Sequence, residues 1–199
     1  MRTLFAVGIA FALTVNAQDA KSVIAAVSKA MGMDGVSSIH YYGTAQNGNL
    51  GQNNNANQPW PTAGANDYVR VIDFAGTVSR ATWVNYAVPV TGGPATMVPQ
   101  EQRITAQSPW AQQVEIYITP WGFLKGAAAN KATVATVEGK RVVTVTGSAK
   151  SPGGPAYKVV GTINARNLVE RVQTWLENPV FGVMLVDAQY TQYRTGAVG

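Results

Sequence analysis

The sequence predicts a mainly β, α+β protein: a curved antiparallel sheet or half-barrel of about seven to nine strands, with an N-terminal helix and one short internal helix. Three observations lead to this fold class. Short segments of alternating apolar and polar residues recur between Gly, Pro and Asn residues. Only two segments show the spacing of an amphipathic helix. The 46% hydrophobic residues are enough for a core, whereas the 13% charged residues are few for a helical bundle.

The first seventeen residues have the three parts of a cleavable secretory signal peptide. Arg2 supplies the charge, residues 4–15 supply an apolar run, and small residues precede Gln18. A buried helix and a membrane anchor are the alternatives, but the run is shorter than the roughly 20 apolar residues that a spanning helix needs. We therefore expect a periplasmic or secreted product, residues 18–199, that forms a single β-rich domain with no stable membrane insertion after cleavage.

The beginning of the mature chain is expected to form a helix, a strand and a long loop. In residues 19–31 the apolar side chains recur at helical spacing. Residues 37–43 alternate as a strand does, whereas residues 45–66 are rich in Asn, Gly and Pro and read as a loop. Within that loop Trp60 stands between two prolines, and we favour a plug in the core over a lid on a cavity.

Strands and a second helix are expected in the middle of the chain. Pro120 suits the first turn of a short helix, and Asn130 suits its end. The expected strands cover residues 68–74, 82–88 and 114–118, with a Pro- and Gly-rich loop at 89–100.

Two hairpins and a final strand complete the expected sheet. One hairpin turns near Gly139 and the other at 164–167, and residues 184–190 alternate cleanly as the last strand. No returning strand follows, which leaves an edge that proteins normally cover. We therefore expect the natural product to continue past Gly199, with a frayed tail as the alternative.

The residue inventory contains little catalytic chemistry. His40 is the only histidine and there is no cysteine, whereas zinc sites draw on several such ligands. No Gly-x-Ser-x-Gly segment accompanies His40, and the ten acidic residues form no recognisable pair. Glu170 and Arg171 read as members of cross-strand ion pairs. The basic residues are scattered, so we expect no nucleic-acid partner and no catalytic, cofactor-binding or metal-binding residue.

The aromatic residues are the feature of the sequence that suggests a ligand pocket. Five tryptophans are many for this length, and a shared pocket for a hydrophobic small molecule or lipid is one hypothesis. Packing in the core is the alternative for each residue. The candidate pocket residues are Trp60, Trp83, Tyr117, Trp121, Phe123 and Tyr190.

Four segments resemble the N-terminal region of exported bacterial hydrolases of the metallo-β-lactamase (MBL) fold: EIYITPWGFLKGAAAN, NLVERVQTWLENPVFG, QPWP and IAAVSKAMG. The resemblance extends over nearly all the mature chain. It implies a downstream hydrolase domain in cis that binds zinc through a His-x-His-x-Asp-His motif. This chain lacks that motif, and Trp121 stands where such hydrolases commonly have a His. Zinc is therefore expected only in a missing downstream domain, and no residue here receives a catalytic or metal-binding role.

The layout is also similar to periplasmic lipoprotein carriers of the LolA class, whose half-barrels hold acyl chains. The covering N-terminal helix and the closing segment from Tyr190 to Gly196, with Tyr193 between, carry this likeness. Three functions therefore stay open. The first is a non-catalytic exported accessory domain, normally fused to an MBL-fold zinc hydrolase, that positions the enzyme or binds an apolar or polymeric ligand. The others are a free-standing carrier of a lipid or other hydrophobic ligand and a fragment of a zinc hydrolase.

Overall fold

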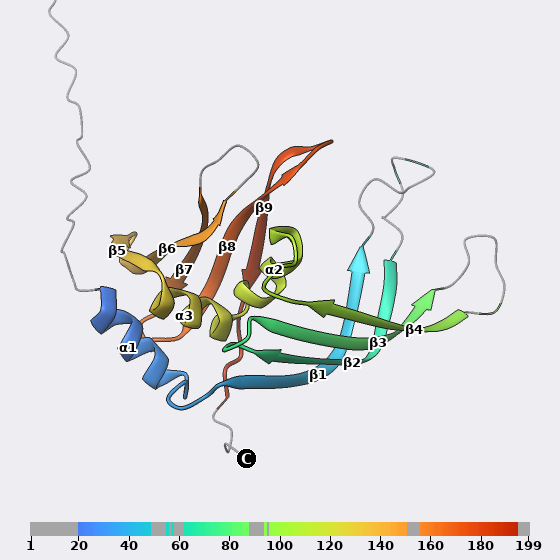
Figure 1. Ribbon diagram of the computed structural model, residues 1–199, viewed down its shortest axis with the longest axis horizontal. Coiled ribbons are helices and arrows are strands. Elements are labelled where there is room, and N and C mark those ends of the chain that lie inside the picture. The colour runs from blue at the N-terminus through green and yellow to red at the C-terminus, as the bar shows by residue number, and fades with distance from the viewer. Residues whose placement is uncertain are drawn as a thin grey trace, which may run out of the picture. The chain divides into compact units, whose positions relative to one another are not determined.

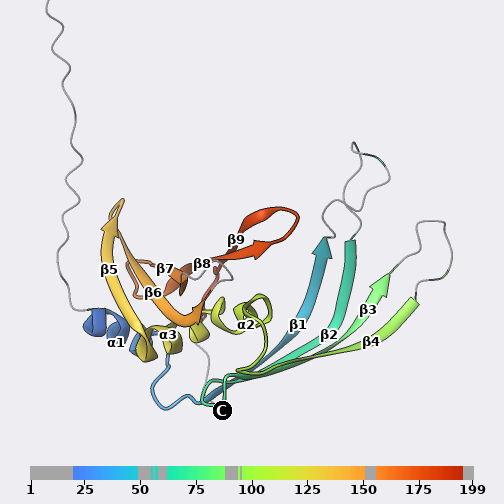
Figure 2. The same cartoon turned by 45° about the horizontal axis from the view of Figure 1, so that its top comes forward.

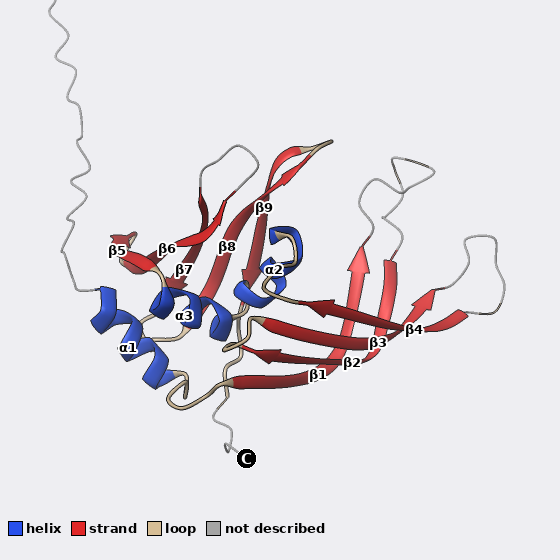
Figure 3. Ribbon diagram, viewed as in Figure 1, coloured by secondary structure: helices blue, strands red, loops and turns tan. Residues whose placement is uncertain are grey.

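A computed structural model describes residues 20–48, 55, 57, 62–87, 94, 96–150 and 156–194. In these residues the chain forms nine strands and three helices (Figures 1 and 3). It divides into two compact units: residues 1–33 with 118–199, and residues 34–117. The predicted signal peptide, Trp60 and the chain end after Arg194 lie outside the described residues.

The first unit is a five-stranded antiparallel sheet with two helices on one face. The strand order is β5-β6-β7-β8-β9, so β5 and β9 are the edges. Figure 2 shows both helices on the same side of this sheet, in agreement with their contacts to each other and to β5. The elements are α1 (Ala20–Ala30), α3 (Pro120–Ala129), β5 (Lys131–Val137), β6 (Lys140–Lys150), β7 (Ala156–Ile163), β8 (Val169–Asn178) and β9 (Gly182–Gln189).

Local chemistry fixes where α3 begins and ends. The hydroxyl of Thr119 accepts a hydrogen bond from the amide of Gly122, which satisfies a donor that the first turn leaves unpaired. Pro120 opens the helix because its fixed φ suits that position and its missing N–H costs nothing there. At the other end, the backbone and side-chain nitrogens of Asn130 both donate to the carbonyl of Gly126. The predicted helix and its end at Asn130 are therefore confirmed.

The core of the first unit lies between α3 and the sheet. Phe123 is 1% exposed, and its ring lies over Gly161 of β7. A Cβ at Gly161 would come within 2.3 Å of that ring, so only glycine admits the helix at this distance. Strand residues that alternate toward α3 are buried with it: Val143, Val145, Val159, Ile163 and Val172.

The second unit is a four-stranded antiparallel sheet in the order β1-β2-β3-β4, with one helix. Ile72 and Ile104 of the sheet and Ile116 of the helix form its apolar core, with Ile39 and Phe74 packed against them. The elements are β1 (Ser38–Gly48), β2 (Thr62–Asp73), β3 (Val78–Ala87), β4 (Thr96–Ile104) and α2 (Trp110–Tyr117).

The predicted fold class is confirmed: the described chain is mainly β, its strands are antiparallel, and it has an N-terminal helix. The strands make two sheets rather than one. The predicted loops at 45–66 and 89–100 were too long, because β1 continues to Gly48, β2 begins at Thr62 and β4 begins at Thr96. Pairing with β2 extends β1, and pairing with β3 extends β4, in spite of the polar composition of these segments.

The strand predicted at 114–118 is wrong, because residues 110–117 form α2. Val114 and Ile116 alternate with polar residues, as in a strand. However, Ser108 and Pro109, which suit the start of a helix, directly precede the segment. The carbonyl of Pro109 accepts from the amides of both Gln112 and Gln113 in the first turn. The helix then directs Glu115 toward the sheet, where it meets a buried arginine. Tertiary contact thus overrides the alternating pattern.

We predict that Gly161→Ala destabilises the protein by about 1–3 kcal/mol, because the added methyl group overlaps a ring that is itself too buried to move. Urea unfolding of wild type and variant measures the change. Gly43→Ala is the matched control, since a Cβ at this strand glycine meets nothing within 4 Å. Equal destabilisation by the two substitutions would show that Phe123 does not require glycine at position 161.

Candidate binding site

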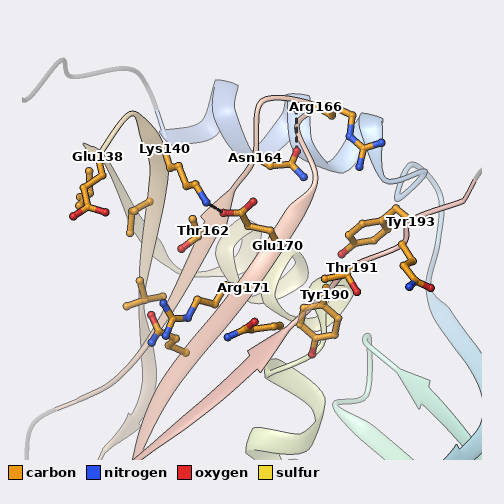
Figure 4. Close-up of a pocket in the computed structure, with 16 residues that line it drawn as sticks. Glu138, Lys140, Thr162, Asn164, Arg166, Glu170, Arg171, Tyr190, Thr191 and Tyr193 are labelled. Carbon is orange, nitrogen blue, oxygen red and sulfur yellow. Dashed lines mark hydrogen bonds and ion pairs between the residues drawn. The ribbon is translucent and has the colours of Figure 1, made fainter.

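A cavity of about 770 Å³ lies on the outer face of the β5–β9 sheet, the face opposite α1 and α3. Strand alternation places its residues there, because Val142, Thr162 and Gln173 alternate with the buried residues of the helix-facing side. Loop residues Asn164 and Arg166 and the segment after β9 complete the wall (Figure 4).

The strand register arranges polar side chains in rows across this face. Thr162 of β7 is opposite Arg171 of β8, which is opposite Gln189 of β9. In the next row Gln173 stands opposite Asp187. Cross-strand partners on one face lie close enough to interact. Amide, hydroxyl and charged groups of three strands therefore meet on the floor of the cavity, together with Val142 and Val160.

Four charged side chains on this face form two ion pairs. The ammonium of Lys140 contacts the carboxylate of Glu170 (Figure 4). Arg171 donates from Nε and Nη2 to both oxygens of Asp187, with an Nε–Oδ1 distance of 2.9 Å. These hydrogen bonds lower the pKa of Asp187 below its ordinary value. The predicted cross-strand ion pairs of Glu170 and Arg171 are thus confirmed.

A register irregularity explains how Glu170 reaches the cavity. Thr162 pairs with Arg171, but the next residue of β7, Ile163, pairs with Val169. Glu170 is therefore an extra residue in β8, and its side chain joins the same face as that of Arg171. Its carbonyl also accepts a hydrogen bond from the amide of Tyr190. This hydrogen bond connects the residue that follows β9 to the cavity wall.

Two tyrosines hold the segment after β9 against the unit. The hydroxyl of Tyr190 donates to the carbonyl of Ile118 at 2.7 Å, and that of Tyr193 donates to the carbonyl of Val169 at 2.6 Å. Figure 4 shows both rings on one flank of the cavity. Burial raises the pKa of Tyr190 and raises the pKa of Tyr193 to about 12. The hydroxyls therefore act as anchors.

The structure distributes the predicted pocket residues over both units. Trp83 and Tyr117 belong to residues 34–117, where Trp83 lies beside Tyr68 and Tyr117 stacks on Trp110. The first unit holds Trp121, Phe123 and Tyr190, and of these Tyr190 lines the cavity on the outer face. Trp60 lies outside the described residues.

Sequence reasoning missed most of the cavity. Gln173, Gln189 and Tyr193 were assigned no function, although each lies on or just after a predicted strand. Strand alternation was the available signal, because it places Gln173 and Gln189 on the face opposite the buried Val172 and Thr174. Alternation does not give the strand register, and the register is what places side chains of three strands in one row across the sheet.

A buried arginine organises the polar part of the second unit. The guanidinium of Arg70, 3% exposed, donates to the hydroxyls of Tyr68 and Ser79 at 2.6 and 3.1 Å. It also contacts the carboxylate of Glu115 on α2 and donates to the amide oxygen of Gln102 at 2.7 Å. The amide of Gln102 donates to the other oxygen of Glu115 at 2.8 Å. This network fixes α2 on the sheet, so we assign it a structural role.

The described residues contain neither a cluster of metal-ligating side chains nor a helix that could span a membrane. Within them, no three His, Cys, Asp or Glu side chains gather as a metal site. None of the helices in that part of the chain has the length and apolar character needed to cross a bilayer. No family model, curated protein or solved structure matches the chain. The MBL-fold and carrier resemblances therefore rest on the quoted motifs and stay predictions.

We predict that the protein loses stability at alkaline pH and that Tyr190→Phe/Tyr193→Phe reduces this loss. The pKa of Tyr193 is about 12 in the folded chain, against an ordinary value of 10.0. Its contribution is fully present below pH 10.0 and disappears as the pH rises toward 12, because the unfolded chain ionises first. Urea unfolding at a series of alkaline pH values measures the slope. Tyr42→Phe, at an 82% exposed position, should leave the slope unchanged; equal slopes in all three proteins would contradict the anchoring role.

We predict that Arg70→Met destabilises the protein by about 2–3 kcal/mol. The substitution leaves four polar partners of the guanidinium without it, but Glu115 is 39% exposed, so water moderates the loss. Chemical unfolding measures the change. Arg80→Met is the control, because the Arg80 pair with Glu101 is exposed and should contribute little. An equal loss of stability in both variants would show that the burial of Arg70 does not determine its contribution.

Proposed function

We propose that this chain is an exported, non-catalytic accessory domain that binds a neutral, polar, polymeric ligand on the outer face of the β5–β9 sheet. The single observation that carries the proposal is the cavity of about 770 Å³ on that face, whose floor includes hydrogen-bonding side chains from three adjacent strands. The signal-peptide pattern supports export. The motif resemblance supports fusion to an MBL-fold zinc hydrolase, which this domain would position on the polymer.

The two ion pairs on this face favour a neutral ligand over a charged one. Lys140 is paired with Glu170, and Arg171 with Asp187, so these two of the three cations that line the cavity already have a carboxylate, and Arg166 is the third. By contrast, the side chains of Gln173 and Gln189 make no hydrogen bond within the part of the chain that the structure describes. Such groups match a ligand rich in hydroxyls and amides, as an oligosaccharide is.

The runner-up is a carrier of a lipid or other hydrophobic ligand. A second cavity of about 510 Å³ favours this function, because it lies between α1, α3 and β5. Ile24, Ala127 and Ala132 give its lining an apolar part, although Lys21 and Asn130 also line it. A fragment of a zinc hydrolase remains the third candidate, supported by the motif resemblance alone.

We predict that Gln173→Ala/Gln189→Ala weakens oligosaccharide binding at least about tenfold, because two hydrogen-bonding groups are lost from the cavity floor. Titration calorimetry with soluble tetramers of β-1,4-linked glucose and N-acetylglucosamine measures the affinity. Gln107→Ala removes an exposed glutamine of the other unit and should leave the affinity unchanged.

The same protein preparation separates the three candidates. Saturable binding of a fluorescent fatty acid, with no oligosaccharide binding, would favour the carrier. Zinc-dependent turnover of an ester or β-lactam by this chain would favour the hydrolase. Binding of neither class of ligand would reject the proposed site.

A further inference from the structure

We infer that the β8–β9 hairpin is a docking element that inserts its tip into the surface of an anionic lipid bilayer. Large apolar side chains gather on this hairpin and are exposed: Val180 by 80%, Phe181 by 68% and Val183 by 68%. Leu185 is 50% exposed and Trp175 is 41% exposed. This inference is independent of the proposed function, because none of these residues lines the cavity on the outer face.

The hairpin geometry places these side chains together. Trp175 pairs with Leu185, and two residues closer to the turn Val183 pairs with Glu177 on the same face. Val180 and Phe181 form the turn between the strands. Figure 1 shows this turn at the projecting end of β8 and β9, away from α1 and α3. The apolar surface thus continues from the middle of the hairpin to its tip.

Two backbone amides of the turn have an acceptor within the hairpin itself. The amides of Val180 and Phe181 both donate to the side-chain oxygen of Asn178, at 2.8 and 3.0 Å. An amide that enters a bilayer without a partner is heavily penalised, because hydrocarbon offers no acceptor. Asn178 satisfies both donors at the most exposed point of the hairpin. The tip can therefore leave water with its apolar side chains and without unpaired amides.

The size and chemistry of the surface favour a bilayer over a second copy of the chain. A stable protein interface engages about 20–30 residues on each side, whereas this surface consists of one hairpin. A shallow lipid contact needs only a few apolar side chains. Trp175 lies farther from the tip than Phe181, which suits the preference of tryptophan for the headgroup region.

Net charge supplies the preference for anionic lipid. The chain carries a formal charge of +5 at pH 7, and +4 once Arg2 is removed with the signal peptide, which attracts it to a negative surface within about a Debye length. Near the hairpin, Lys158 and Glu177 line the same hollow as Trp175, so the local charges offset each other. Attraction therefore comes from the whole chain, and the position of contact comes from the apolar tip.

Co-sedimentation with vesicles tests the inference. The protein is exported from a bacterial host, and intact mass verifies that all variants share one N-terminus. Vesicles of phosphatidylglycerol mixed with phosphatidylcholine should bind the wild type, and phosphatidylcholine vesicles should bind it more weakly. We predict that Val180→Ser/Phe181→Ser lowers the partition coefficient at least about tenfold, because two apolar side chains no longer leave water.

A matched control and a second readout complete the test. Tyr42→Ser/Met97→Ser removes two exposed apolar side chains, 82% and 62% exposed, from the other unit and should bind as the wild type does. Phe181→Trp provides a local probe, which lipids brominated on their acyl chains should quench more than they quench the wild type. Equal vesicle binding by all variants, absence of binding, or a dimer in light scattering that the tip substitutions dissociate would overturn the inference.

Discussion

The first unit depends on the close approach of one phenylalanine ring to one glycine. Because Gly161 has no side chain, Phe123 reaches the backbone of β7 and α3 lies directly on the sheet. The valines of the neighbouring strands then fill the space around the ring at the density of a protein interior. Strand alternation sends every intervening residue to the opposite face. The polar outer face and its cavity are thus a geometric consequence of an apolar contact on the other side.

The second unit reaches a similar arrangement by different chemistry. Its helix also covers a sheet, but the contact includes the guanidinium of Arg70 and the carboxylate of Glu115 as well as three isoleucines. A planar guanidinium with fixed donor directions accepts few positions of its partners, so it defines the placement of α2 more narrowly than apolar packing alone. Apolar burial supplies the driving force, and the arginine network supplies the orientation.

The sequence predicted the elements whose signals are local. Both hairpins of the first unit, α1, and α3 with its end at Asn130 follow from alternation, helical spacing and capping residues. Residues 114–118 were misread because Val114 and Ile116 alternate as in a strand, and the deciding contact of Glu115 is with a residue distant in sequence. The cavity was missed for the same reason. Gln173 and Gln189 become neighbours of one site only through the register of β8 and β9, and Glu170 joins them through the extra residue in β8.

The division of the chain also sets the order in which it can fold during synthesis. Residues 34–117 are continuous and hold all the partners of Arg70, so this unit can complete its contacts once Tyr117 has emerged from the ribosome. The α1 helix has no such partner nearby, because it packs against α3 and β5, which are made after the whole second unit. Val23, Ile24 and Val27 therefore stay unburied through most of translation. The segment that directly follows the expected export signal can pack only after α3 and β5 have been made, so it lacks its partners while the second unit is being synthesised.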